Sequence, residues 1–258
     1  MPAKKKSARV RLVEKKAPRK AATVATVLKL LERRGAKATR DGMARYGIVA
    51  PKAFGVTMGA MKQIAKGIGP NHTLALALWA TEWYEARMLA TLIDDPLQVT
   101  SAQMDQWCRD FDNWAICDTA CFALFDRTPH AWRKVESWSR HQGEFQKRAA
   151  FALLACLALH RKDADDAAFM KLLPLIDHAA SDERNFVRKG ASWALRAVGE
   201  RSPALNAAAA AMARRLAASS DATERWLGKD ALRELTSAKV AKRTARRDEK
   251  RKAPAVAG

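Results

Sequence analysis

The sequence predicts an all-helical solenoid, in which antiparallel helix pairs stack side by side in a row. Strong helix formers (Ala, Leu, Arg, Lys, Glu and Met) dominate from about residue 23 to residue 237. No segment alternates apolar and polar residues with β-branched enrichment, so strands are not expected. From about residue 100 the expected helices pair into units of roughly 30–45 residues, a period typical of helical repeats. Such stacking places one helix of each pair on a concave face, where a binding groove is expected.

Capping residues indicate where the helices begin. Asn71 can accept a hydrogen bond from the first turn of a helix, and Thr128 and Ser202 each precede a proline that suits the first helical position. Thr100 with Gln103 fits a capping box, in which two side chains satisfy each other's backbone N–H groups. The expected helices span residues 23–34, 57–68, 71–80, 82–93, 100–110, 113–125, 129–140, 143–160, 164–178, 182–199, 203–219 and 221–236, and residues 42–55 are expected to form an ordered loop.

The net charge of +20 predicts a polyanionic partner. Much of that charge lies at the two ends, because residues 1–22 carry +8 and residues 238–258 carry +6. Residues 23–237 therefore carry +6. We expect two disordered basic tails around one folded domain at 23–237. Such tails bind any nucleic acid by releasing counterions, without preference for sequence.

Several classes of protein are not expected. The longest apolar run, 149–159, has 11 residues and is too short to span a bilayer, and no secretory signal is recognised. The histidines and cysteines show no metal-ligand spacing and no glycine loop for phosphates is present, so neither a metal nor a nucleotide cofactor is expected. We expect a reduced, cytoplasmic compartment and association with the nucleoid. The four cysteines, which follow no pairing pattern that we recognise, are Cys108, Cys117, Cys121 and Cys156.

The most unusual local feature pairs an aromatic residue with a carboxylate. Trp114 and Asp118 are four residues apart, so on a helix they share one face. An indole beside a carboxylate suits a pocket for a cationic group, through cation–π and Coulomb attraction. A core tryptophan with a surface acid nearby is the alternative. Arg148 and Trp193 follow at spacings near one repeat, which would place them beside Asp118 on the same face.

Other charged residues are weaker candidates. Lys189 lies one turn before Trp193 and is expected either to face phosphate or to be a solvated helix charge, and Arg45 and Lys52 flank the expected loop as possible phosphate contacts. Glu85 and Arg87 are expected to form an ion pair between helices. The remaining tryptophans that we expect in the core or between repeats are Trp79, Trp83, Trp107, Trp132, Trp138 and Trp226.

Five segments resemble the AlkD-type DNA alkylation repair proteins, which are DNA glycosylases built from HEAT-like repeats. The resemblance covers roughly residues 25–236, and the segments occur in the order of that family. It implies a HEAT-like superhelix, monomeric, with a basic concave groove that grips duplex DNA. The segments are Tyr46–Gly55, Tyr84–Ala90, Trp114–Asp118, Lys147–Ala150 and Phe186–Arg196.

The resemblance also implies an activity, the hydrolysis of the N-glycosidic bond of cationic alkylpurines such as N3-methyladenine and N7-methylguanine. By that resemblance Asp118 matches the catalytic carboxylate. Trp114 and Trp193 match an aromatic pair that packs against the deoxyribose of the lesion, and Arg148 matches a cation that holds the DNA backbone. Many relatives carry an acid directly after the first tryptophan, where this chain has Ala115.

Two other functions fit the same composition. One is a non-catalytic solenoid that recognises distorted or branched DNA by shape and charge. The other is a protein scaffold whose tails bind nucleic acid incidentally. If the protein is a scaffold, a core of residues 23–237 should no longer bind DNA at moderate salt. The glycosylase and the non-catalytic binder are distinguished by Asp118, which is essential only for the glycosylase.

Overall fold

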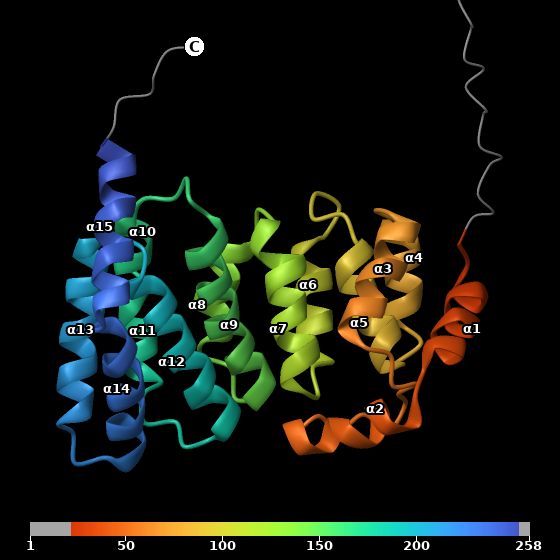
Figure 1. Cartoon of the computed structure of the whole chain (residues 1–258), viewed down its shortest axis with the longest axis horizontal. Helices are drawn as coiled ribbons and strands as arrows, with labels where there is room; N and C mark the ends of the chain where they lie inside the picture. Colours follow the sequence, from red (N-terminus) through yellow and green to blue (C-terminus); the bar gives the residue numbers. More distant parts are fainter. Residues whose placement is uncertain (1–21, 253–258) are drawn as a thin grey trace, which may run out of the picture.

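The computed structural model describes residues 22–252, and these form a row of helices without any strand (Figure 1). The prediction of an all-helical fold is confirmed. In the described residues, no helix combines the length and the apolar character needed to cross a membrane. The helices are α1 (Val24–Arg34), α2 (Lys37–Gly42), η1 (Met43–Tyr46), α3 (Met58–Ile68), α4 (His72–Trp79), α5 (Tyr84–Ile93), α6 (Ser101–Arg109), α7 (Trp114–Ala123), η2 (Phe125–Arg127), α8 (Ala131–Trp138), α9 (Glu144–His160), α10 (Asp166–Met170), α11 (Leu173–His178), α12 (Asn185–Gly199), α13 (Pro203–Ala217), α14 (Ala222–Leu235) and α15 (Ala238–Lys252).

The helices form two layers, as expected of a solenoid. In one layer α3 packs on α5, α5 on α7, α7 on α9, α9 on α12 and α12 on α14. The other layer contains α4, α6, α8 and α13. Of these, α4 packs on α5, both α6 and α8 pack on α9, and α13 packs on α12 and α14. Apolar side chains from both layers fill a single core that runs the length of the row. Residues one repeat apart therefore become neighbours, which is the condition for assembling a site from α7, α9 and α12.

Side-chain caps begin two helices where the sequence predicts. The Oδ1 atom of Asn71 accepts a hydrogen bond from the Leu74 N–H at 2.9 Å at the start of α4. The Oγ atom of Ser202 accepts from the Leu205 N–H at 3.1 Å at the start of α13. These bonds satisfy backbone donors that have no partner within the helix, so the helices begin at these residues.

Two other predicted caps are corrected. Thr128 does not cap α8, because its hydroxyl donates to the Phe125 carbonyl at 2.8 Å and α8 begins only after Pro129. Thr100 does cap α6, but the capping box is incomplete, because the Gln103 side chain donates to Asp94 at 2.7 Å instead. The Thr128 hydroxyl thus bonds to the turn before it, and the Gln103 amide bonds to the residue that ends α5.

The helix expected over 164–178 is divided into α10 and α11. Pro174 lies in the first turn of α11. A proline there is tolerated, whereas inside a continuous helix it would remove a hydrogen bond and clash with the preceding turn. The expected loop at 42–55 also differs at its start, since α2 and η1 occupy residues 37–46.

The expectation of a disordered tail from residue 238 is wrong for residues 238–252, which form α15 beside α13 and α14 (Figure 1). Val240 and Thr244, one turn apart, are buried with exposed fractions of 1% and 3%. Arg243 forms an ion pair with the Glu200 carboxylate, and Arg247 donates to the Glu200 carbonyl. The folded chain thus extends past the expected boundary at 237. The expected tail at 1–22 lies, but for residue 22, outside the described residues, as do residues 253–258.

Close contact between α13 and α14 requires glycine at position 228. A Cβ atom on Gly228 would lie 2.3 Å from the Ala217 nitrogen and 2.6 Å from the Ala213 oxygen, both backbone atoms. We expect Gly228→Ala to lower the free energy of unfolding by about 2–3 kcal/mol, because the two helices must separate to accept the methyl group. Urea denaturation measures the change.

The matched control is Gly59→Ala in α3, where the described residues place no atom within 4 Å of the added Cβ. That variant is expected to be stabilised by about 0.5–1 kcal/mol, since alanine favours the helix. Equal midpoints for the two variants would show that α13 and α14 are not packed as closely as described.

Candidate functional site

Asp118 and Arg148 form a two-pronged ion pair between α7 and α9. The Arg148 Nε donates to Asp118 Oδ1 at 2.8 Å, and its Nη2 donates to Oδ2 at 2.7 Å. The remaining nitrogen, Nη1, donates to the Phe186 carbonyl at the start of α12 at 2.8 Å. The guanidinium therefore joins three consecutive helices of one layer, and this geometry fixes the orientation of the carboxylate.

Most of this pair is removed from water. The side chains of Arg148 and Asp118 are 8% and 20% exposed. Burial raises the pKa of the Asp118 carboxyl, and the Arg148 guanidinium opposes that shift. Burial also acts against the charge on Arg148, but the Asp118 carboxylate prevails and raises the pKa of the guanidinium. The exposed part of Asp118 is thus an oriented carboxylate at the edge of a low-dielectric region.

Local structure explains why Asp118 faces outward from the core. Asn113 begins α7 by accepting a hydrogen bond from the Ile116 N–H at 3.0 Å. Trp114, Asp118 and Phe122 then follow at intervals of four residues and share one face of α7. Ile116 lies on the opposite side and is buried.

An open pocket of about 600 Å³ lies against this face of α7. Asp118 and Trp193, which the sequence predicts to be neighbours, both line it. Its walls are mainly apolar side chains with a few charged groups. The lining residues are Met58, Lys62, Leu92, Asp118, Thr119, Phe122, Ala123, Arg127, His160 and Trp193.

Trp114 is placed differently from Trp193. Its indole Nε1 donates to the Tyr46 carbonyl at 2.8 Å, which ties α7 to the end of η1. Tyr46 itself is 72% exposed and is followed by Gly47 in the left-handed region, with φ of 69°. Trp114 therefore anchors an exposed loop beside the pocket. The sugar-facing role that the resemblance implies for Trp114 stays a prediction.

Glu85 does not form the predicted ion pair with Arg87. The Glu85 carboxylate is fully buried and accepts three backbone hydrogen bonds, from the N–H groups of Phe54 (2.9 Å), Gly55 (2.7 Å) and Val56 (3.1 Å). A buried carboxylate with three donors is well satisfied without a cation. Glu85 thus holds the loop before α3 against α5.

Arg87 has other partners. Its guanidinium lies over the Trp79 ring, 5.2 Å from the centroid, and Nη1 donates to the Asp110 carbonyl at 3.3 Å. The indole of Trp79 in turn donates to the Asp110 carboxylate at 2.8 Å. Arg87 therefore joins α5 to the end of α6 by stacking and hydrogen bonding.

Four residues were predicted to contact DNA. Arg148 is buried in its ion pair with Asp118, and its role at the DNA backbone stays a prediction. Arg45, Lys52 and Lys189 are exposed, but they are not equally available. Lys52 forms an ion pair with Glu82 at 2.6 Å, so its charge is balanced locally. Arg45 on η1 and Lys189 on α12 have no ion pair within residues 22–249. The structure therefore leaves Arg45 and Lys189 as the freer cations, and their contact with DNA stays a prediction.

Eight pocket residues were not predicted as site residues, and four of these carry charged or aromatic side chains. Phe122 is 49% exposed although it is aromatic, and Lys62 and Arg127 are exposed cations of the pocket wall. His160 lies across from Phe122 with 4.5 Å between the ring centroids, and its Nδ1 is bonded to the buried Asp126 carboxylate. Only Phe122 carried a signal in the sequence, because it continues the four-residue spacing of Trp114 and Asp118.

The described residues hold no group of three or more His, Cys, Asp or Glu side chains arranged to bind a metal ion. A family model described as DNA alkylation repair enzyme matches residues 27–235. No curated protein matches the chain.

A solved structure shares the fold, with a TM-score of 0.69, 21% sequence identity, and coverage of 83% of this chain and 96% of the other. It is described as "a new family of proteins related to the HEAT-like repeat DNA glycosylases with affinity for branched DNA structures". The predicted HEAT-like solenoid is thereby confirmed.

Proposed function

This chain belongs to the DNA alkylation repair enzyme family, and we propose that it hydrolyses the N-glycosidic bond of cationic alkylated purines in duplex DNA. The lesions are those of the N3-methyladenine and N7-methylguanine class. The observation that carries the proposal is the Asp118 carboxylate, which Arg148 orients at the wall of a pocket that Trp193 also lines.

The chemistry of the bond explains why so small a site suffices. A positively charged purine is already a good leaving group, so little general-acid catalysis is needed. Its departure leaves an oxocarbenium-like sugar, as in glycoside hydrolysis. A fixed carboxylate stabilises that positive charge and orients a water molecule for attack, while an indole beside the sugar adds cation–π attraction and excludes solvent. Asp118 and Trp193 are the residues assigned to these roles.

The proposal is tested by measuring the release of N7-methylguanine from methylated duplex DNA. We expect Asp118→Asn to reduce release at least a hundredfold, about 2.7 kcal/mol of barrier, with DNA binding retained. Asparagine keeps the shape of the side chain but removes the charge that stabilises the sugar cation. Thermal melting of the variant checks that it is folded.

Asp165→Asn is the matched control, because Asp165 is an exposed carboxylate at the start of α10 whose side chain makes no capping bond. It is expected to release base at the rate of the unchanged protein. Retention of full activity by Asp118→Asn would remove Asp118 from the mechanism.

A second candidate function is supported by the solved structure described as having affinity for branched DNA. In that case the chain would bind distorted or branched DNA without breaking a bond. If neither the unchanged protein nor Asp118→Asn releases base and both bind DNA, this second function replaces the first. To test the scaffold alternative, the shortened protein has to end after α15, because a core of residues 23–237 would lack that folded helix.

A further inference from the structure

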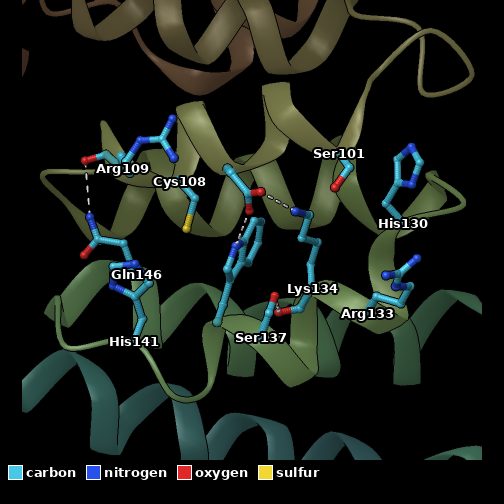
Figure 2. Close-up of a pocket in the computed structure, with 11 residues that line it drawn as sticks. Ser101, Cys108, Arg109, His130, Arg133, Lys134, Ser137, His141 and Gln146 are labelled. Carbon is cyan, nitrogen blue, oxygen red and sulfur yellow. Dashed lines mark hydrogen bonds and ion pairs between the residues drawn. The ribbon is translucent and has the colours of Figure 1, made fainter.

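A second pocket, of about 490 Å³, lies between α6 and α8 (Figure 2). These two helices belong to the layer that does not carry Asp118. Three basic side chains line the pocket, together with two histidines and one carboxylate. The basic side chains are Arg109, Arg133 and Lys134, the histidines are His130 and His141, and the carboxylate is Asp105.

Each oxygen of the single carboxylate has a hydrogen-bond partner. Lys134 Nζ is 2.6 Å from Asp105 Oδ2, and the Trp138 indole donates to Oδ1 at 2.8 Å. Lys134 is itself largely buried, with a side chain 8% exposed. Asp105 and Lys134 thus neutralise each other within the pocket, so its remaining charge comes from Arg109 and Arg133.

The uncompensated charge lies at the two ends of the pocket. Figure 2 shows Arg109, Gln146 and His141 at one end, and Arg133 near His130 at the other, with Lys134 between the two ends. Both arginines are exposed, and neither has an ion pair within residues 22–249. Free guanidinium groups in a polar hollow are suited to phosphate, which they bind through two parallel hydrogen bonds.

The length of the pocket favours a chain of phosphates over a single one. It extends along α6 from Ser101 to Arg109, which at a rise of 1.5 Å per residue is about 12 Å. A nucleic acid strand carries one phosphate per roughly 3.4 Å of duplex axis. The Ser101 hydroxyl at one end of this line supplies a neutral donor, which also suits a sugar-phosphate backbone.

We propose that the pocket between α6 and α8 binds the phosphate backbone of a second DNA segment, separate from the segment at Asp118. The two pockets are built from different layers of the solenoid, so one duplex lying along the Asp118 face does not fill both. The protein then holds two DNA arms at once. This inference takes DNA as the polyanion but does not depend on base release.

The test compares two double variants of the full chain. Arg109→Gln with Arg133→Gln removes the free charges of the pocket. Arg214→Gln with Lys229→Gln removes two exposed charges of α13 and α14 that line neither pocket. Binding to a four-way DNA junction and to a linear duplex of equal arm length is measured by fluorescence anisotropy over a range of salt concentrations.

We expect the pocket variant to bind the junction at least tenfold more weakly, with a salt dependence lower by about two phosphate contacts. Its affinity for the linear duplex and its rate of base release from saturating linear DNA should match those of the control variant. Equal loss in both variants, or equal loss on junction and duplex, would overturn the inference. Absence of base release by the unchanged protein would count against the proposed function instead, and would leave the comparison of junction and duplex binding valid.

Inorganic phosphate separates the two possible sources of the anion. If the pocket serves a free phosphate compound, millimolar inorganic phosphate should saturate it in calorimetry, and the pocket variant should abolish that heat without changing junction affinity. That outcome would also overturn the inference. A DNA site predicts weak phosphate binding together with the junction-specific loss.

Discussion

Arg148→Met is expected to lower the free energy of unfolding by about 3–5 kcal/mol, the range for removing one partner of a buried ion pair. In the unchanged protein both oxygens of Asp118 accept hydrogen bonds from the guanidinium. The loss is large because Asp118 keeps its charge in the variant but no longer has these partners. The bond from Arg148 to the Phe186 carbonyl is lost as well. Urea denaturation at neutral pH measures the change, and the methionine retains most of the apolar stem.

Two comparisons test whether that loss comes from the Asp118 carboxylate, which has no partner in the variant. Combining Arg148→Met with Asp118→Asn removes the charge and should recover part of the stability. Burial raises the folded-state pKa of Asp118 even with Arg148 present, and without Arg148 it rises further. A raised folded pKa penalises the folded state only above the unfolded pKa, about 3.9. The penalty should therefore shrink as the pH falls from the raised folded-state pKa towards about 3.9, and it should be absent below that value. A pH-independent loss would refute this explanation.

Glu85→Ala is the second large effect, with an expected loss of about 3–5 kcal/mol in the free energy of unfolding. The substitution leaves the N–H groups of Phe54, Gly55 and Val56 without their acceptor, and each unsatisfied buried donor costs about 1–3 kcal/mol. Chemical denaturation measures the stability. Amide hydrogen exchange at these three residues should accelerate, since the loop is no longer held on α5.

Glu85→Gln is the graded control. Two of the three bonds share Oε1, and a glutamine oxygen in that position can keep them while its NH₂ group faces the Phe54 N–H. We expect a loss smaller than that of the alanine variant and slower exchange at Gly55 and Val56. A glutamine variant as unstable as the alanine variant would mean that charge, rather than acceptor count, holds the loop.

Much of the fold could be predicted because the relevant forces are local. Caps such as Asn71 and Ser202 satisfy backbone groups three residues away, so their effect is visible in a short window. Thr128 has the sequence of a helix cap but does not act as one, because its hydroxyl donates to a carbonyl in the preceding turn. The chain from 238 was misjudged because its composition suits a solvated tail, and only the neighbouring Glu200 and core surface make it a helix that packs.

The candidate site was predicted where repeat spacing determines contact. Asp118, Arg148 and Trp193 are separated by about one repeat each, so stacking alone brings Asp118 to Arg148. The partners of Glu85 lie about thirty residues earlier, and Trp114 bonds to Tyr46. The sequence carries no periodic signal for such contacts between helix and loop. The pocket between α6 and α8 likewise has no periodic signal in the sequence, because its charged residues come from separate polar segments.

Helix α15 also has a consequence for how the molecule ends. A stack of helix pairs has an apolar face at each end, on which another copy can add head to tail and begin a filament. Val240 and Thr244 bury their side chains at the last pair, while the exposed Lys239, Lys242 and Arg246 give α15 a polar outer side. In the part of the chain that the structure describes, α15 thus covers the end of the last helix pair. Any engineered extension by further repeats has to be inserted before Ala238, so that this polar helix still closes the row.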